Sequence, residues 1–133
     1  MISISRLNIP PCPKPRMTKA DRWRKRPSVL KFFAFRDAVR QYKTSNVVLQ
    51  SAYHSNNLEF DSFEIEFHVP MPKSWSKTKR EDKDGTPHQQ RPDLDNYLKA
   101  WKDSVYDEDA IVWKVKASKL WTDGTGHILV NYL

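Results

Sequence analysis

The sequence predicts an α/β (α+β) fold: one domain spanning residues 1–133, with a mixed β-sheet and helices packed on it. Three observations indicate this class. The chain has 133 residues, the length of one ordinary domain. Hydrophobic residues make up 38% and aromatic residues 12% of the chain, which is enough for a core without covalent cross-links. Segments with a strand pattern alternate with segments with a helical pattern, as in domains where helices cover a sheet.

The N-terminal third is expected to form a strand, a loop and a helix. Residues 2–9 largely alternate apolar and polar side chains, the two-residue period of a strand. Prolines at positions 10, 11, 13 and 15 exclude regular structure there, so residues 10–27 are expected to form a long basic loop. A helical pattern follows over residues 28–45, with Ser28 as a possible N-cap. The expected apolar positions of this helix are Leu30, Phe33, Ala34, Ala38 and Tyr42.

The rest of the chain is expected to hold a strand, an irregular segment, a helix and two strands. Residues 56–57, both asparagine, suit a turn, and residues 63–69 alternate as a strand with one apolar face. Prolines and a glycine interrupt residues 70–92, which we expect to be irregular. A helical pattern spans residues 93–105, and strands are expected over residues 110–120 and at the C-terminus. Trp101 and Trp113 fit the expected core pattern.

The cysteine count and the hydropathy of the chain limit its class. Cys12 is the only cysteine, so an intrachain disulfide and zinc sites that need two cysteines are excluded. No apolar run approaches the roughly 18 residues that span a bilayer, and the N-terminus lacks the apolar region of a signal peptide. We therefore expect a cytoplasmic protein of a bacterial host or phage-infected cell, without a membrane partner.

The charge distribution indicates a polyanionic partner. The formal net charge is +7, and residues 14–43 contain eleven basic residues but only two acidic ones, Asp21 and Asp37. A basic solvated surface would have the same composition, so charge alone leaves both interpretations open. Trp23 and Trp75 lie in basic loops, where they would either stack on unpaired bases or pack against the domain. The candidate DNA-binding residues are Lys14, Arg16, Arg22, Arg24, Lys25, Arg26, Lys73, Lys77, Lys79, Arg80 and Arg91.

Six acidic residues lie between Arg91 and Val112 in this basic chain. Asp93 and Asp95 converge if Asp93 lies in extended backbone before the helix and Asp95 in its first turn. Lys99 then follows Asp95 by one turn on the same face. Residues 107–109, Asp-Glu-Asp, follow the helix, although the sequence alone does not show that the chain brings them back to the first two acids.

Two interpretations of these acids remain open at this point. Convergent carboxylates are ligands for Mg²⁺ or Mn²⁺, ions that hydrolyse phosphodiesters by activating water. Alternatively, Asp93 caps the helix, Asp95 forms an ordinary ion pair with Lys99, and the later acids face solvent. The histidines are scattered without ligand spacing, and His88 is expected at the surface.

The residues PKSWSKTKR, GTPHQQRPDLDNYLKAWKDSV and VYDEDAIV, with the later Lys119, resemble the RusA family of Holliday-junction resolvases of phages and prophages. The likeness covers most of the chain but is poor over residues 40–62. It implies a homodimeric, Mg²⁺-dependent endonuclease of recombination and repair, with Mn²⁺ as a possible substitute and four-way DNA junctions as substrate. It also implies that Asp93, Asp95 and Asp109 are catalytic metal ligands and Lys99 an essential lysine, supported by Asn96 and Glu108. Ile111 departs from the glutamine usual in the family, which leaves Asp107 as an alternative to Asp109. A non-catalytic DNA-binding protein and a nuclease for a flap or an RNA structure are the rival functions.

Overall fold

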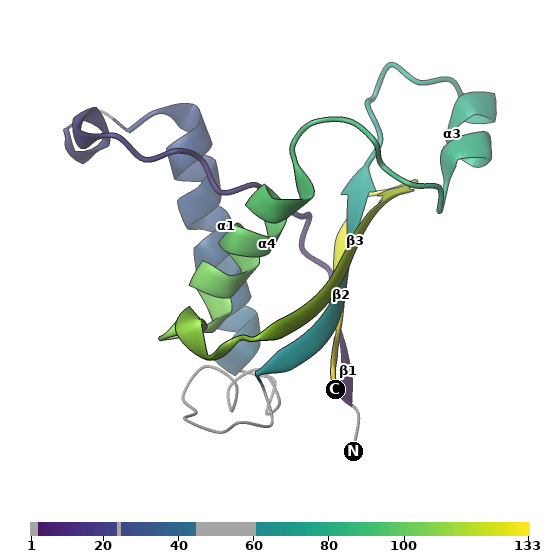
Figure 1. Ribbon diagram of the computed structural model, residues 1–133. Coiled ribbons are helices and arrows are strands. Elements are labelled where there is room, and N and C mark those ends of the chain that lie inside the picture. The colour runs from purple at the N-terminus through teal and green to yellow at the C-terminus, as the bar shows by residue number, and fades with distance from the viewer. Residues whose placement is uncertain (1–2, 24, 45–60) are drawn as a thin grey trace.

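Four strands form one mixed sheet in the order β1–β4–β2–β3 (Figure 1). The strands are β1 (Ser3–Leu7), β2 (Ser62–Pro70), β3 (Lys114–Thr122) and β4 (His127–Tyr132). β4 is antiparallel to both β1 and β2, whereas β2 and β3 are parallel. This computed structural model describes residues 3–23, 25–44 and 61–133, so the expected turn at residues 56–57 lies outside the described residues.

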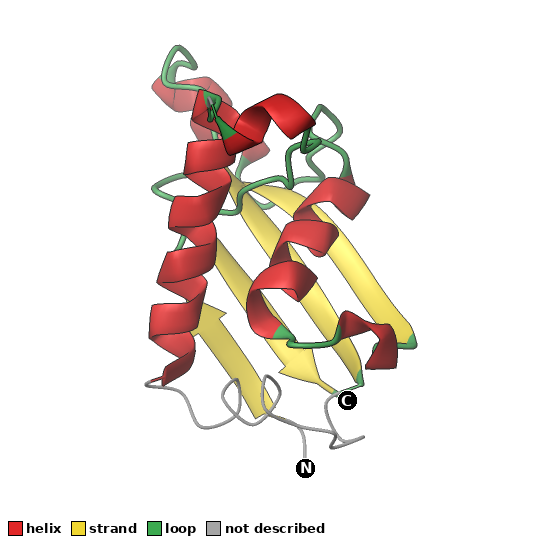
Figure 2. Ribbon diagram, turned by 90° about the vertical axis from the view of Figure 1, so that its left-hand side faces the viewer, coloured by secondary structure: helices red, strands yellow, loops and turns green. Residues whose placement is uncertain are grey.

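Helices α1 (Pro27–Thr44) and α4 (Leu94–Val105) lie side by side on one face of the sheet (Figure 2). The parallel pair β2–β3 needs a crossover connection, and that crossover contains α3 (Lys77–Lys83) and α4. Two short 3₁₀ helices, η1 (Lys19–Arg22) and η3 (Asp109–Ile111), lie in the loops before α1 and before β3. The predicted class, a mixed sheet with packed helices, is therefore confirmed.

The core lies between the sheet and the two long helices. Phe63, Ile65 and Phe67 of β2 are buried, as their alternation predicts. Trp101 of α4 is fully buried, and the ring of Tyr97 stacks on Phe67 with a centroid distance of 5.5 Å. Helix α4 is thereby fixed against β2, which sets the position of its N-terminal residues. None of the helices in the described part of the chain is long and apolar enough to cross a membrane.

The expected apolar face of α1 was wrong by about one residue. The buried residues are Val29, Phe32, Phe35 and Val39, whereas Leu30 is 53% exposed. Both sets satisfy a helical spacing because the segment has apolar side chains on more than one face. Packing against α4 and the sheet selects the set that contains two of the three phenylalanines.

Two further expectations need correction. Residues 77–83, expected to be irregular, form α3, whose N-cap Ser76 accepts a hydrogen bond from the backbone N of Lys79 at 3.2 Å. Trp113 is 70% exposed because β3 begins only at Lys114, and the residues before it form η3. A Ser-Lys-Thr start with charged residues after it suits a short solvent-facing helix, which hydrophobic periodicity does not detect.

Candidate functional site

The start of α4 presents two acidic side chains to solvent. Asp93 is the N-cap residue with extended backbone (φ −68°, ψ 151°), and Asp95 lies in the first turn. Both residues are exposed. Asp93 makes no side-chain capping bond, so its carboxylate is not used to close the helix. The expected placement of the two acids is thus observed, and the alternative role of Asp93 as a side-chain cap is not.

The loop before Asp93 is fastened along β3 by backbone hydrogen bonds. Gly85 N donates to Trp121 O at 2.8 Å, Trp121 N to Thr86 O at 2.9 Å, and His88 N to Lys119 O at 3.0 Å. The segment therefore runs beside β3 before the chain enters α4.

Lys119 adds a second attachment close to the acids. Its Nζ donates to Gln90 O at 2.6 Å and to Pro92 O at 2.7 Å, the carbonyl directly before Asp93. Lys119 pairs in register with Phe67 and so belongs to the face of the sheet that the helices cover. Its side chain bridges the strand and the entry to α4. Lys119 is among the residues that carry the family resemblance, but the sequence assigns it no role, because the bridge joins segments 27 residues apart.

His88, expected at the surface, is buried. Its ring lies 4.2 Å from that of Trp121, and only 4% of the residue is exposed. Burial, with a smaller contribution from the Lys119 ammonium, lowers the pKa of His88 below its ordinary value. A neutral histidine in this position helps to hold the loop on β3 and does not reach out to a ligand.

Lys99 contacts acids on the side away from Asp95. Its Nζ lies 2.9 Å from Asp103 Oδ1 and 3.1 Å from Asp109 Oδ2, so its partner four residues away is Asp103. The hydrogen bonds that Lys99 donates to Asp103 and Asp109 raise the pKa of Lys99. Lys102 Nζ lies 3.9 Å from the same oxygen of Asp109. The expected Asp95–Lys99 pair is therefore replaced by a link between the middle of α4 and η3.

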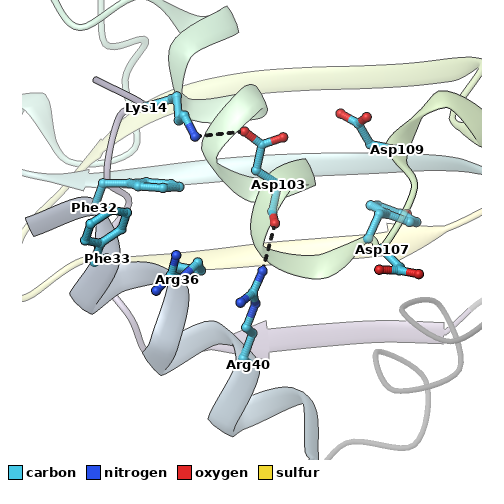
Figure 3. Close-up of a pocket in the computed structure, with 9 residues that line it drawn as sticks. Lys14, Phe32, Phe33, Arg36, Arg40, Asp103, Asp107 and Asp109 are labelled. Carbon is cyan, nitrogen blue, oxygen red and sulfur yellow. Dashed lines mark hydrogen bonds and ion pairs between the residues drawn. The ribbon is translucent and has the colours of Figure 1, made fainter. Parts of the chain in front are cut away.

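Asp103 is a polar centre that the sequence did not single out. Besides Lys99, its carboxylate binds Lys14 Nζ at 3.1 Å (Figure 3). Burial opposes ionisation of Asp103, but the bonds from Lys99 and Lys14 outweigh it and lower the pKa. The sequence signal for this contact is the i,i+4 spacing of Lys99 and Asp103, which is the same as the spacing of Asp95 and Lys99.

A cleft of about 300 Å³ opens beside Asp103, between α1 and the end of α4 (Figure 3). Arg40 crosses one side of the cleft with hydrogen bonds to the carbonyls of Ser104 at 3.4 Å and Asp103 at 3.5 Å. The side chains that line the cleft are Lys14, Phe32, Phe33, Arg36, Arg40, Asp103, Tyr106, Asp107 and Asp109. Asp109 thus has basic neighbours on α1 and α4, in contrast to Asp93 and Asp95.

The supporting residues have local structural contacts. Glu108 is the N-cap of η3, and its side chain accepts a hydrogen bond from Ala110 N at 3.1 Å. The Asn96 carbonyl accepts a hydrogen bond from Lys14 N at 3.0 Å, which ties the N-terminal loop to the first turn of α4. The Asn96 side chain remains exposed beside Asp95.

The donor chemistry fits a divalent cation at the start of α4. Mg²⁺ commonly keeps several waters and binds protein through one or two carboxylates together with substrate phosphate oxygens. Asp93 and Asp95 supply two such carboxylates. Across residues 3–23, 25–44 and 61–133, no three acidic, histidine or cysteine side chains come together as a metal-binding group. Asp109 lies by the Lys99 and Lys102 ammonium groups, so within one described chain the expected set of three acids is not assembled.

The candidate DNA-binding residues fall into two groups. Lys14, Arg26 and Arg80 form ion pairs with Asp103, Asp21 and Asp123, respectively. Arg80 also donates to the carbonyls of Trp75 and Pro72, at 3.1 and 2.7 Å, so its main contacts are internal. Arg24 lies outside the described residues. The remaining candidates, all exposed, are Arg16, Arg22, Lys25, Lys73, Lys77, Lys79 and Arg91.

A comparison with known protein families identifies the family of this chain. The family model described as endodeoxyribonuclease RusA matches residues 8–131, nearly the whole chain. No curated protein matches the chain. The matched range includes the loop on β3, all of α4 and the acids of η3. The chain therefore belongs to the RusA endodeoxyribonuclease family, whose members cleave Holliday junctions.

Proposed function

We propose that this protein resolves four-way DNA junctions by hydrolysing phosphodiester bonds in a Mg²⁺-dependent reaction, with Mn²⁺ as a possible substitute. Family membership supports the endodeoxyribonuclease activity and the junction substrate. The dependence on a cation is our inference from the residues. Its main support is the exposed pair Asp93 and Asp95 at the start of α4, for which no ion pair or side-chain hydrogen bond is found in the part of the chain described.

Two adjacent carboxylates without a cationic partner repel each other, so they favour a bound cation over an empty site. When bound there, the ion would supply activation of a water molecule and stabilisation of the leaving oxygen. Asp93 and Asp95 would hold it, and Lys119 would keep the backbone before Asp93 in place. Lys99 lies one turn after Asp95 and is bonded to Asp103 and Asp109 in this structure; turned from them toward bound DNA, its ammonium would offset the charge that develops on the phosphate.

We propose that the active protein is a homodimer. Resolution of a junction needs two symmetric nicks, and each nick needs its own catalytic centre. One chain of 133 residues has a single Asp93–Asp95 pair, so two chains are required. Sedimentation equilibrium at micromolar concentration tests the assembly, and a purely monomeric protein that makes paired nicks would contradict it.

The deciding experiment is cleavage of a synthetic four-way junction, with a linear duplex of the same sequence alongside. We expect paired nicks in the junction with Mg²⁺, none after chelation, and no cleavage of the duplex. Junction binding without cleavage under any divalent ion would identify a non-catalytic DNA-binding protein. Preferential cleavage of a flap or an RNA structure in the same assay would assign a different substrate.

A further inference from the structure

Trp23 is a large apolar side chain held almost entirely in solvent. It is 86% exposed, at the C-terminal end of η1. Met17, on the other side of η1, is 40% exposed. Exposing an indole is unfavourable unless a partner covers it, and tryptophan is among the residues most enriched at binding hot spots. The described fold offers no such cover, so Trp23 suits an external ligand.

The other tryptophans show that this exposure is unusual within the chain. Trp101 is fully buried and Trp121 is 6% exposed. Trp75 packs against Trp121 at 4.8 Å and has Lys79 Nζ over its ring at 4.3 Å. Only Trp113 is comparably exposed, and it lies between the acidic residues 107–109 and the exposed Lys114 and Lys116, in surroundings of mixed charge.

The segment that holds Trp23 is pre-organised by a buried carboxylate. Asp21 accepts hydrogen bonds from Thr18 N at 2.8 Å and Thr18 Oγ1 at 3.1 Å. It also accepts two from Arg26, from Nε at 3.0 Å and from Nη2 at 2.9 Å. Arg26 Nη2 donates in addition to Arg16 O, so one guanidinium joins both ends of the segment. A ligand that meets Trp23 therefore loses less free energy to ordering of the loop.

The surface around Trp23 is positive. Lys19, Arg22 and Lys25 are exposed, and Asp21 is the only acid between Lys14 and Arg36. Because Asp21 is buried and paired with Arg26, it does not offset these charges at the surface. A hollow of about 560 Å³ beside the indole is lined by Met17, Thr18, Lys19, Arg22 and Trp23, and is large enough for a nucleobase. Cationic side chains next to an open aromatic face form the combination that binds single nucleotides of DNA by backbone contact and stacking.

The position of η1 fits a ligand that also reaches the acids of α4. Lys14 N is bonded to Asn96 O, next to Asp95, and Trp23 is nine residues further along the chain. Nine residues span no more than about 32 Å, which is less than one helical turn of duplex DNA, about 34 Å. Figure 1 shows η1, in purple, at the upper left, in the same half of the molecule as the start of α4. One DNA substrate can therefore contact both places.

We propose that Trp23 is a base-stacking residue that inserts at the branch point of the junction and covers the face of a base exposed there. In this arrangement Arg22 and Lys25 bind the flanking phosphates, and Asp21 with Arg26 holds the segment that presents the indole. Stacking gives selectivity for branched DNA, because a continuous duplex has no free base face at a reachable position. The inference rests on the proposed junction substrate.

The test compares Trp23→Ala, Trp23→Phe and the matched control Trp113→Ala, measured by anisotropy on a labelled four-way junction and a linear duplex with Mg²⁺ omitted. Loss of one stack should weaken junction affinity of Trp23→Ala by about 5- to 150-fold. Duplex affinity should change much less, phenylalanine should retain most of the junction affinity, and Trp113→Ala should match the wild type. A junction with 2-aminopurine at the branch point should also fluoresce less in complex with the wild type than with Trp23→Ala.

Two results would overturn the inference. Equal losses for junction and duplex would make Trp23 a general DNA contact. Unchanged junction affinity in Trp23→Ala, when the wild type prefers junctions, would assign the exposed indole to another partner. A wild-type protein that binds junction and duplex equally would instead refute the proposed substrate. Thermal melts of both Trp23 variants should match the wild type, since an exposed side chain contributes little to stability.

Discussion

Lys99 joins Asp103 and Asp109 through one ammonium group, at 2.9 and 3.1 Å. These contacts leave two outcomes for its replacement. If the lysine only links α4 to η3, its removal costs roughly 0.3–0.5 kcal/mol of stability, as for half-exposed ion pairs, and leaves the rate unchanged. If it also stabilises charge on the phosphate, Lys99→Ala slows single-turnover cleavage by about 100-fold or more.

We expect the second outcome, slower cleavage by Lys99→Ala. Lys99→Arg should recover only part of the cleavage rate, because a planar guanidinium places its charge differently from a compact ammonium. The measurement is single-turnover cleavage at saturating enzyme, with thermal melts alongside. Because the pKa of Lys99 is raised on folding, its contribution to the free energy of unfolding is complete below its ordinary pKa of 10.5. That contribution is lost only as the pH rises through the higher pKa of the folded protein, so Lys99 is charged at neutral pH. The slow rate of the variant should therefore persist across neutral pH. Wild-type rates with slightly lower stability would leave Lys99 a structural residue.

Asp93→Asn and Asp95→Asn should each abolish cleavage and keep junction affinity. Asparagine preserves the shape of the side chain but removes the charge that attracts a divalent cation. Asp37→Asn, at an exposed acid of α1 whose side chain is 68% exposed, is the matched control and should cleave like the wild type. Cleavage by either site variant at the wild-type rate would show that the reactive centre is elsewhere. The same assay applied to Asp107→Asn and Asp109→Asn distinguishes between these two acids.

Asp21 makes the η1 segment sensitive to acid. The hydrogen bond from Arg26, followed by that from Thr18 N, lowers the pKa of Asp21 to about 2 from an ordinary 3.8. A lowered folded pKa means that the stabilisation is complete above about pH 4 and is lost as the pH falls toward 2. The melting temperature of Asp21→Asn should therefore lie below that of the wild type at pH 5 and approach it near pH 2. A constant difference across this range would mean that the charge of Asp21 is unimportant.

Among the elements, the loop on β3 determines where α4 begins, and Lys119 is its attachment next to Asp93. Lys119→Met keeps the aliphatic chain but removes the donors to Gln90 O and Pro92 O. A displacement of Asp93 by about 1 Å would slow cleavage by about 10- to 100-fold and raise the Mg²⁺ concentration needed for half the maximal rate. Lys116→Met, at an exposed position on the same strand, is the matched control. A lower melting temperature in Lys119→Met without a change in Mg²⁺ dependence would limit Lys119 to a structural role.

The elements also show which structural features the sequence predicts and which it does not. Alternation in β2 and the D-x-D pattern at α4 depend on neighbours within a few residues, and both were placed correctly. The apolar face of α1 was misassigned because its phase depends on contact with α4. The partners of Lys99 were misassigned for a similar reason: an acid four residues before and one four residues after satisfy the same spacing. Lys119 and its carbonyl partners are far apart in sequence, so no local pattern indicates the contact.

Across the whole molecule, exposed basic side chains gather in the loop around η1 and in the segment around α3, where they alternate with the exposed acids Glu81, Asp82 and Asp84. The two segments lie at opposite sides of the view in Figure 1. The start of α4, with Asp93 and Asp95, lies between them in that view. The same end of the sheet contains the loop fastened to β3. DNA that contacts the basic side chains of both segments would therefore cross Asp93 and Asp95, which would otherwise repel it. A net charge of +7 makes this attraction strong at low ionic strength.

The salt dependence of junction binding tests which surface faces the DNA. Each phosphate neutralised by a lysine or arginine adds about −0.9 to the slope of log affinity against log salt. The double variant Arg22→Ala/Lys25→Ala should reduce the magnitude of the slope by about two, because both side chains are exposed near Trp23. Arg26 is left unchanged because it holds Asp21.

The matched control is the double variant Lys114→Ala/Lys116→Ala. It removes the same charge from exposed positions at the start of β3, far from η1 in Figure 1, and should leave the slope near the wild-type value. Anisotropy titrations of a labelled junction between about 50 and 200 mM salt cover the range in which such slopes are measured. Equal slopes for the two double variants would mean that only net charge matters, and would place the DNA away from η1.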